Sequence, residues 1–218
     1  MRLLLAGLTL LASVAAAAAH MVLIVPQADG KSAIVVFSDS LEPDDNVKID
    51  KIAGLKLLAR IGDKSVPVEA KVAEHKLTVE LPANTRFVAG TVTYGISGKA
   101  TPASLLVYHP KAVLLGTGAD ATIGKDAAVE IVPVTAGGKT RFLVLAAGKP
   151  VADSEGTITL PDGKKEKATT DKDGFTKSFE ATGRYAAYFK FVEKKDGEHT
   201  GVKYAEIRHY ATLVADVK

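Results

Sequence analysis

The 218-residue chain contains no cysteine and no tryptophan, and only 6% of its residues are aromatic. Without a thiol, the chain has no disulfide framework, no thiolate metal site and no cysteine nucleophile. An excess of charge is missing too: 28 Lys and Arg residues stand against 25 Asp and Glu residues, a formal net charge of +3. Such a small excess, spread along the chain, does not suit the neutralisation of phosphates. We therefore expect no nucleic-acid partner.

Motifs for nucleophilic catalysis and for phosphate or calcium binding are also missing. The sequence has no Gly-x-Ser-x-Gly elbow, and Gly116-Thr117-Gly118 lacks the helix and lysine of a phosphate loop. Asp171 and Asp173 begin like a calcium loop, but no closing glutamate follows, so Asp173-Gly174 is interpreted as a turn. The acidic residues between positions 39 and 45 are interpreted as a solvated loop. These absences argue against nucleophilic catalysis and against phosphate or calcium binding at these motifs.

The N-terminus has the pattern of a secretory signal peptide. Met1 and Arg2 form a short basic region, and residues 3–12 are an apolar run that is too short for a stable anchor. The alanines at positions 15–19 allow cleavage after Ala17, Ala18 or Ala19. No second apolar run reaches the roughly 20 residues that a membrane span needs. We expect residues 1–19 to be removed and the mature chain to be a bacterial periplasmic or secreted protein with no stable membrane span.

The rest of the chain predicts an all-β protein. Short apolar or alternating runs are separated by turn residues, with almost no helical periodicity. In the first half, strands are expected at 21–26, 32–38, 55–61, 67–72, 76–81, 87–96 and 103–109. In the second half, they are expected at 128–133, 139–146, 149–151, 156–160, 164–169, 176–180, 184–192 and 204–217.

Two domains are expected to follow the signal peptide. Residues 115–120 are rich in small side chains and have no strand pattern, so the boundary is placed there. Seven strands in about 90 residues is typical of a β-sandwich. We therefore expect residues 20–114 and residues 120–218 to form two immunoglobulin-like β-sandwiches.

The histidines are the strongest candidates for chemistry. None of the five is at metal-motif spacing from another, so a metal site must be assembled from different strands. His75 and His199 lie in hydrophilic turns and are interpreted as exposed loop residues. Period-2 alternation turns His109 and His209 toward the apolar faces of their strands. Each of these two is either a metal ligand or a core histidine held by one hydrogen bond.

His20 gains a second metal donor if the signal peptide is removed. Cleavage places it at or beside a free α-amino group, whose pKa of about 8 lets it yield its proton to a metal. Cleavage after Ala19 gives a histidine brace, in which the amine and imidazole of His20 need one further imidazole. Cleavage after Ala17 gives a square-planar site with two backbone amides. Nitrogen donors without thiolate favour Cu(II), Ni(II) or Zn(II), so His20, His109 and His209 are expected to bind a divalent transition ion such as Cu, Ni or Co.

Four segments carry a resemblance to a known family. They are AHMVLIVP at 19–26, LVYHPK at 106–111, GKPVA at 148–152 leading to TDKDG at 170–174, and RHYATLV at 208–214. Together they resemble the exported domain family that contains the periplasmic component of nickel and cobalt uptake systems. The resemblance implies a periplasmic, β-rich, non-enzymatic protein that handles metal. The second half also resembles carboxypeptidase-regulatory modules, which are spacers or binding platforms.

These observations predict a binding protein that captures a divalent Ni, Co or Cu ion and hands it to a membrane metal transporter. The alternative is a structural or adhesion-type β-sandwich module that binds a protein or a glycan and no metal. A copper oxygenase is a third interpretation, because a histidine brace can support oxidative chemistry. Few aromatic residues are present to hold a polysaccharide substrate, which weighs against that third interpretation.

Overall fold

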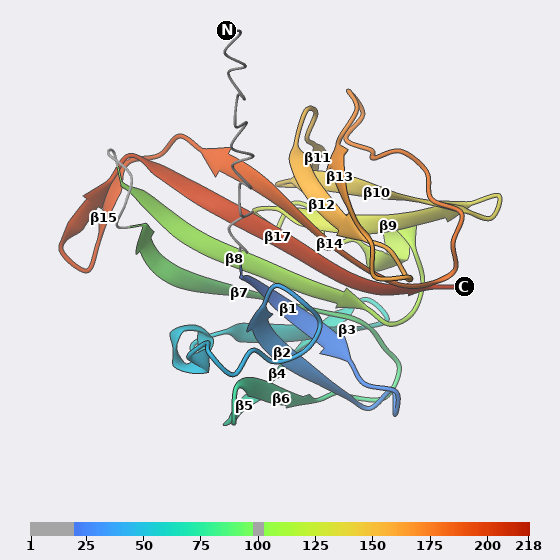
Figure 1. Ribbon diagram of the computed structural model, residues 1–218, viewed down its shortest axis with the longest axis horizontal. Coiled ribbons are helices and arrows are strands. Elements are labelled where there is room, and N and C mark those ends of the chain that lie inside the picture. The colour runs from blue at the N-terminus through green and yellow to red at the C-terminus, as the bar shows by residue number, and fades with distance from the viewer. Residues whose placement is uncertain (1–19, 98–102) are drawn as a thin grey trace, which may run out of the picture.

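The computed structural model describes residues 20–97 and 103–218 of the chain (Figure 1). The predicted signal peptide, residues 1–19, lies outside the described residues. The predicted all-β class is confirmed: the described residues form strands β1 to β17, and their helical content is two short 3-10 helices, η1 (Ile49–Ile52) and η2 (Gly118–Ala121). In this part of the chain, no helix is long and apolar enough to cross a membrane.

The strands of the first half are β1 (Met21–Pro26), β2 (Ser32–Ser38), β3 (Lys56–Ile61), β4 (Lys64–Val68), β5 (Ala70–Ala73), β6 (Lys76–Glu80), β7 (Thr85–Ser97) and β8 (Ser104–Val113). The strands of the second half are β9 (Glu130–Ala136), β10 (Lys139–Ala146), β11 (Lys149–Pro150), β12 (Glu155–Thr159), β13 (Lys165–Thr169), β14 (Gly183–Glu193), β15 (Gly197–His199), β16 (Val202–Tyr204) and β17 (Glu206–Val217).

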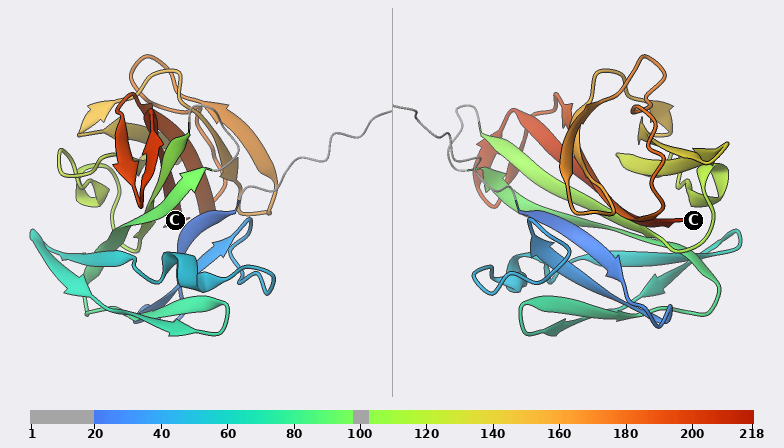
Figure 2. Two further views of the ribbon diagram at one scale, coloured as in Figure 1. Left: turned by 90° about the vertical axis from the view of Figure 1, so that its left-hand side faces the viewer. Right: turned by 45° about the vertical axis from the view of Figure 1, so that its right-hand side comes forward.

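One large sheet runs through the whole molecule. It has eight strands in the order β13-β12-β14-β17-β8-β7-β3-β4. Two smaller sheets, β1-β2-β6-β5 and β11-β10-β9, lie on opposite sides of the long strands, and β15 and β16 form a separate hairpin (Figures 1 and 2). Among the described strands every pairing is antiparallel except that of β8 with β17, which is parallel. The strands of the two halves therefore belong to one central sheet, joined by the pairing of β8 with β17.

Each face of the large sheet has its own core. Apolar side chains of β1 and β2 pack with Tyr108 and Val214 on one face. Side chains of β9 and β10 pack with Ala211 and Leu213 on the other. Neighbouring residues of β17 thus enter different cores, because side chains alternate along a strand. This alternation explains why three consecutive residues of β17, Leu213, Val214 and Ala215, are all apolar and buried.

Most predicted strands match the structure, and three of them, at 21–26, 32–38 and 139–146, match residue for residue. The predicted strand 67–72 is divided at Glu69, where the chain passes from the large sheet to the small one. The predicted strand 176–180 is wrong, since this segment makes only an isolated bridge to β10 through Phe179. β8 continues through Pro110 to Val113. Its pairing with β7 skips His109 and Pro110, while on the other side Pro110 lies opposite Thr212 of β17.

Candidate metal centre

His109 and His209 lie next to each other on the parallel strands β8 and β17. In the strand register His209 is opposite Val107 and Ala211 is opposite His109, so both imidazoles point to the same face of the sheet. Both histidines are buried, since His109 is 9% exposed and His209 is 6% exposed. Nε2 of His109 lies 2.9 Å from Nδ1 of His209, and the ring centroids are 5.1 Å apart. The fold therefore brings together two histidines that are 100 positions apart in the sequence.

Each imidazole is also held through its other nitrogen. Thr91 Oγ1 on β7 lies 3.2 Å from Nδ1 of His109. Glu193 Oε2, at the end of β14, lies 3.2 Å from Nε2 of His209. The four side chains form one hydrogen-bonded chain, Thr91–His109–His209–Glu193, in which the two inner nitrogens face each other.

The protonation of this chain follows from its burial. Burial, together with the neighbouring His209, lowers the pKa of His109 to about 4, so its ring is neutral at neutral pH. One neutral arrangement has the Thr91 hydroxyl donating to His109, His109 donating to His209, and His209 donating to the Glu193 carboxylate. If His109 instead carries its proton on Nδ1 and donates to Thr91, both inner nitrogens present lone pairs. A metal ion could then bind both inner nitrogens, in place of the proton that lies between the rings in the first arrangement, and both rings would stay neutral.

The spacing of the inner nitrogens suits two neighbouring positions around one metal ion. Metal–imidazole bonds are about 2.0–2.1 Å long. Two such bonds to nitrogens 2.9 Å apart meet at an angle of about 90°. This is the angle between adjacent ligands in square-planar and octahedral coordination, the geometries that Cu(II) and Ni(II) adopt with nitrogen donors.

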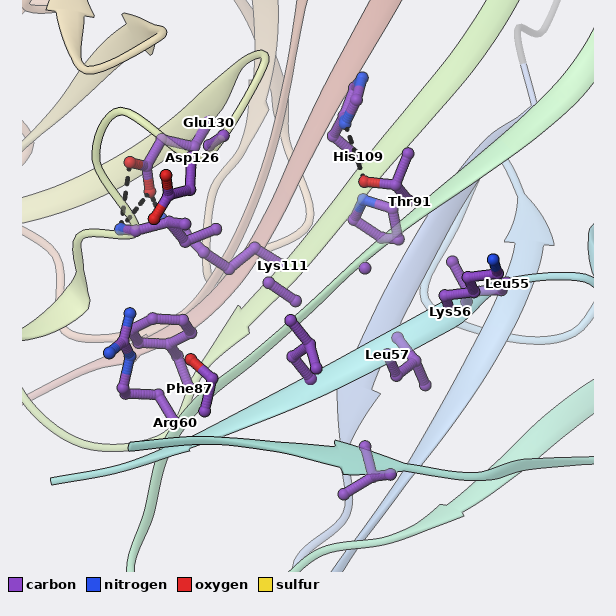
Figure 3. Close-up of a pocket in the computed structure, with 18 of the residues that line it drawn as sticks. Leu55, Lys56, Leu57, Arg60, Phe87, Thr91, His109, Lys111, Asp126 and Glu130 are labelled. Atoms are coloured by element: carbon purple, nitrogen blue, oxygen red, sulfur yellow. Dashed lines mark hydrogen bonds and ion pairs between the residues drawn. The ribbon is translucent and has the colours of Figure 1, made fainter. Parts of the chain in front are cut away.

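A groove of about 840 Å³ opens beside His109 (Figure 3). It is formed by parts of β3, β4, β7 and β8 and by residues 123–130. Thr91 and His109 lie at one part of it, and Phe87, Lys111 and Glu130 at another (Figure 3). His109 therefore borders the groove, whereas His209 is not among the residues that line it.

A buried ion pair lies two residues beyond His109 on β8. Lys111 Nζ is 2.6 Å from Glu130 Oε2, and the side chains are 2% and 1% exposed. The ammonium also donates to the carbonyl of Ala121 at 2.9 Å, and the carboxylate accepts the backbone N–H groups of Ile123 and Gly124. Burial lowers the pKa of Lys111, and the facing carboxylate opposes that shift. Because the ammonium has two protein acceptors and the carboxylate accepts from Lys111, Ile123 and Gly124, we assign the pair a structural role, which the sequence analysis missed.

His20 lies in a different place. Its Nε2 is 2.8 Å from Asp44 Oδ2, and its ring centroid is 5.8 Å from that of Phe37. Phe37 packs against Tyr108 in the core under β1 and β2, on the face of the large sheet opposite to His109. The expected site of three histidines is thus not assembled, because β8 turns Tyr108 and His109 to opposite faces. For the same reason neither His109 nor His209 can complete a histidine brace at His20.

The other candidate residues lie in turns. His75 has a φ of 56° between β5 and β6, and His199 ends β15 in a hairpin. Asp171 accepts the backbone N–H groups of Asp173 and Phe175, as expected for a turn. Within residues 20–97 and 103–218, no group of three or more His, Cys, Asp or Glu side chains is arranged to hold a metal ion. A metal ion bound in this part of the chain would have fewer than three such side chains as ligands, and its other ligands would come from water or another molecule.

No protein-family model matches this sequence, and a search of curated proteins gives no match. The resemblance to the nickel and cobalt uptake family therefore stays a prediction.

Proposed function

We propose that the protein is a non-enzymatic binding protein that captures a divalent Cu, Ni or Co ion at the His109–His209 pair. The observation that carries this proposal is the arrangement of the four ring nitrogens. Two of them face each other at 2.9 Å, and each of the other two has an oxygen partner at 3.2 Å. Metal-binding histidines commonly have such an oxygen partner on the second nitrogen, which orients the ring and selects its tautomer.

An ion with only two protein ligands is suited to capture and release. Structural metal sites are closed by four protein ligands, whereas open sites keep positions for water or an incoming group. At the histidine pair the remaining positions would be filled by water or by donors from the receiving protein. Together with the signal-peptide pattern and the family resemblance, this supports a periplasmic carrier that delivers its ion to a membrane metal transporter.

Metal titration of the purified protein, stripped with a chelator, tests this proposal. We expect His109→Gln and His209→Gln each to reduce the number of bound Cu(II) or Ni(II) ions by one. His75→Gln and His199→Gln are the matched controls, because both histidines lie in turns, and they should leave binding unchanged. Thermal unfolding of each variant shows whether it is folded. Unchanged stoichiometry in both folded variants would refute a site at the pair.

A second variant tests the oxygen partner without removing a ligand. Glu193→Gln keeps both imidazoles but replaces the carboxylate that contacts Nε2 of His209. Loss of such a partner lowers metal affinity by roughly 10-fold to 100-fold in known sites. We expect a loss in this range for Glu193→Gln, measured by competition with a chelator of known affinity.

The groove favours a second candidate function. At about 840 Å³ and with a largely apolar lining, it could receive part of a protein or a glycan, as in a structural or adhesion-type module. In that case His109 and His209 would be buried structural residues. Absence of measurable affinity for Cu(II), Ni(II), Co(II) and Zn(II) would favour this second function over metal capture.

A further inference from the structure

We infer that the groove controls the metal affinity of the histidine pair, and that Thr91 is the positioning residue through which it does so. This inference rests on the proposed function, because it concerns the regulation of the same His109–His209 site. Thr91 is exposed and lines the groove, and its hydroxyl oxygen lies 3.2 Å from Nδ1 of His109 (Figure 3). The residue therefore connects the groove with the buried pair.

Glu193 sets the direction of the hydrogen bonds in the metal-free protein. A carboxylate only accepts hydrogen bonds, so a neutral His209 carries its proton on Nε2 and donates it to Glu193 Oε2. Nδ1 of His209 then has a lone pair, and Nε2 of His109, 2.9 Å away, donates its proton to it. Nδ1 of His109 is left as an acceptor, so the Thr91 hydroxyl donates to it. The proton between the two rings occupies the place that an ion would take.

Metal binding reverses the hydrogen bond between Thr91 and His109. An ion bound to Nε2 of His109 requires the ring proton to be on Nδ1, which then donates to the Thr91 oxygen. The hydrogen of the Thr91 hydroxyl now needs a different acceptor. Among the residues that the structure describes, this hydroxyl has no hydrogen-bond partner besides His109. Because Thr91 is exposed and lines the groove, water is the acceptor that remains.

Covering the groove beside Thr91 therefore weakens the binding of the ion. In a covered groove the hydroxyl hydrogen would have no acceptor in the metal-bound state, whereas in the metal-free state it would still donate to His109. A polar group left without its hydrogen bond in this way shifts an equilibrium constant by roughly 5-fold to 150-fold. The ion would be held while the groove is open and released when a receiving protein covers it.

The experiment fills the groove beside Thr91 and measures the metal affinity of the pair. Ala89→Leu is the main variant, because Ala89 lines the groove and lies two residues before Thr91 on β7, on the same face of the strand. The affinity for Cu(II) is measured by competition with a chelator of known affinity, at the site that His109→Gln removes. We expect Ala89→Leu to lower this affinity by roughly 5-fold to 150-fold.

Two sets of variants show whether the effect passes through the Thr91 hydroxyl. Thr91→Val has no hydroxyl, so adding Ala89→Leu to it should cause no further loss of affinity, whereas Thr91→Ser should keep the full effect of Ala89→Leu. Ala73→Leu, on β5 and outside the groove lining, is the matched control for the added volume and should leave the affinity unchanged. Thermal unfolding shows whether each variant is folded. If Ala89→Leu does not fold, Ala128→Leu fills the groove from its other wall, residues 123–130.

The tautomer of His109 is a second measurement, which needs no metal. Nitrogen-15 spectra of the histidine rings in the metal-free protein, assigned by comparison with His109→Gln, show which nitrogen carries the proton. We expect the proton of His109 on Nε2, with Nδ1 accepting from Thr91. A proton on Nδ1 in the metal-free protein would overturn the inference, because Thr91 would then have nothing to reverse.

The outcomes separate this inference from the proposed function. Copper affinity that falls equally on Ala89→Leu with and without the Thr91 hydroxyl would overturn the inference and leave metal capture at the pair in place. Unchanged affinity in the folded groove-filling variant would do the same. If the unsubstituted protein has no copper site that depends on His109, the proposed function and the inference both fail.

Discussion

Removing the charge of Glu130 should destabilise the protein strongly. Glu130→Gln keeps the size of the side chain, but the Lys111 ammonium, 2% exposed, loses its counter-ion. An uncompensated buried charge of this kind costs about 3–5 kcal/mol. The backbone N–H groups of Ile123 and Gly124, which now donate to the carboxylate, also compete for a single amide oxygen. We expect the free energy of unfolding, measured by urea denaturation at pH 7, to fall by about 3–5 kcal/mol.

Two comparisons test the reasoning behind this value. Lys139 and Glu180 form an ion pair of 2.9 Å in which the side chains are 55% and 75% exposed. Glu180→Gln should therefore leave the free energy of unfolding unchanged. The double variant Lys111→Met with Glu130→Leu removes both buried charges and should recover most of the loss. If Glu130→Gln were as harmless as Glu180→Gln, Lys111 would not depend on Glu130 as its buried counter-ion, and the reasoning would be refuted.

Three further outcomes are expected from the structure. The pKa of His109 is about 4 in the folded protein and about 6.5 in the unfolded chain. As the pH falls from about 6.5 to about 4, the unfolded chain takes up a proton at this residue and the folded protein does not, so stability is lost. The loss between pH 7.5 and pH 5 is about 2 kcal/mol, and His109→Gln should remove it in urea denaturation with a chelator present. Gly156→Ala should lower the melting temperature, because a Cβ would lie 2.2 Å from a backbone oxygen of β14, whereas Gly54→Ala meets nothing within 4 Å. Thr212→Val should cost about 1–3 kcal/mol in urea denaturation, since its buried hydroxyl donates to a carbonyl of β1 at 2.6 Å.

Local patterns were sufficient to predict the fold class and most strands. In β10, the residues Thr140, Phe142 and Val144 are buried and alternate with more exposed positions. Such alternation is visible in the sequence, and so is the orientation of His109 and His209 toward apolar neighbours. The segment around Phe179 misled the prediction, because its apolar residues pack on β10 without joining a sheet.

The partners of the functional side chains could not be predicted from local patterns. The contact of His20 with Asp44 depends on where a loop 24 residues away is placed. The ion pair of Lys111 with Glu130 had a visible signal, since each charge interrupts an otherwise apolar run, but nothing in the spacing identifies its partner. Pairing between distant residues is set by the whole fold, so it becomes visible only in three dimensions.

The parallel register of β8 and β17 determines the candidate metal centre. It places Tyr108 opposite Tyr210, with ring centroids 5.3 Å apart, on the face toward β1, and it places His109 and His209 together on the groove face. Sliding β17 past β8 by one residue would turn every side chain of β17 to the other face. The histidines would then separate, and Tyr210 would leave its stack with Tyr108. The tyrosine stack and the histidine pair are therefore two consequences of one register, which the apolar residues of both cores specify, so a metal ion would find the two imidazoles already positioned by the fold.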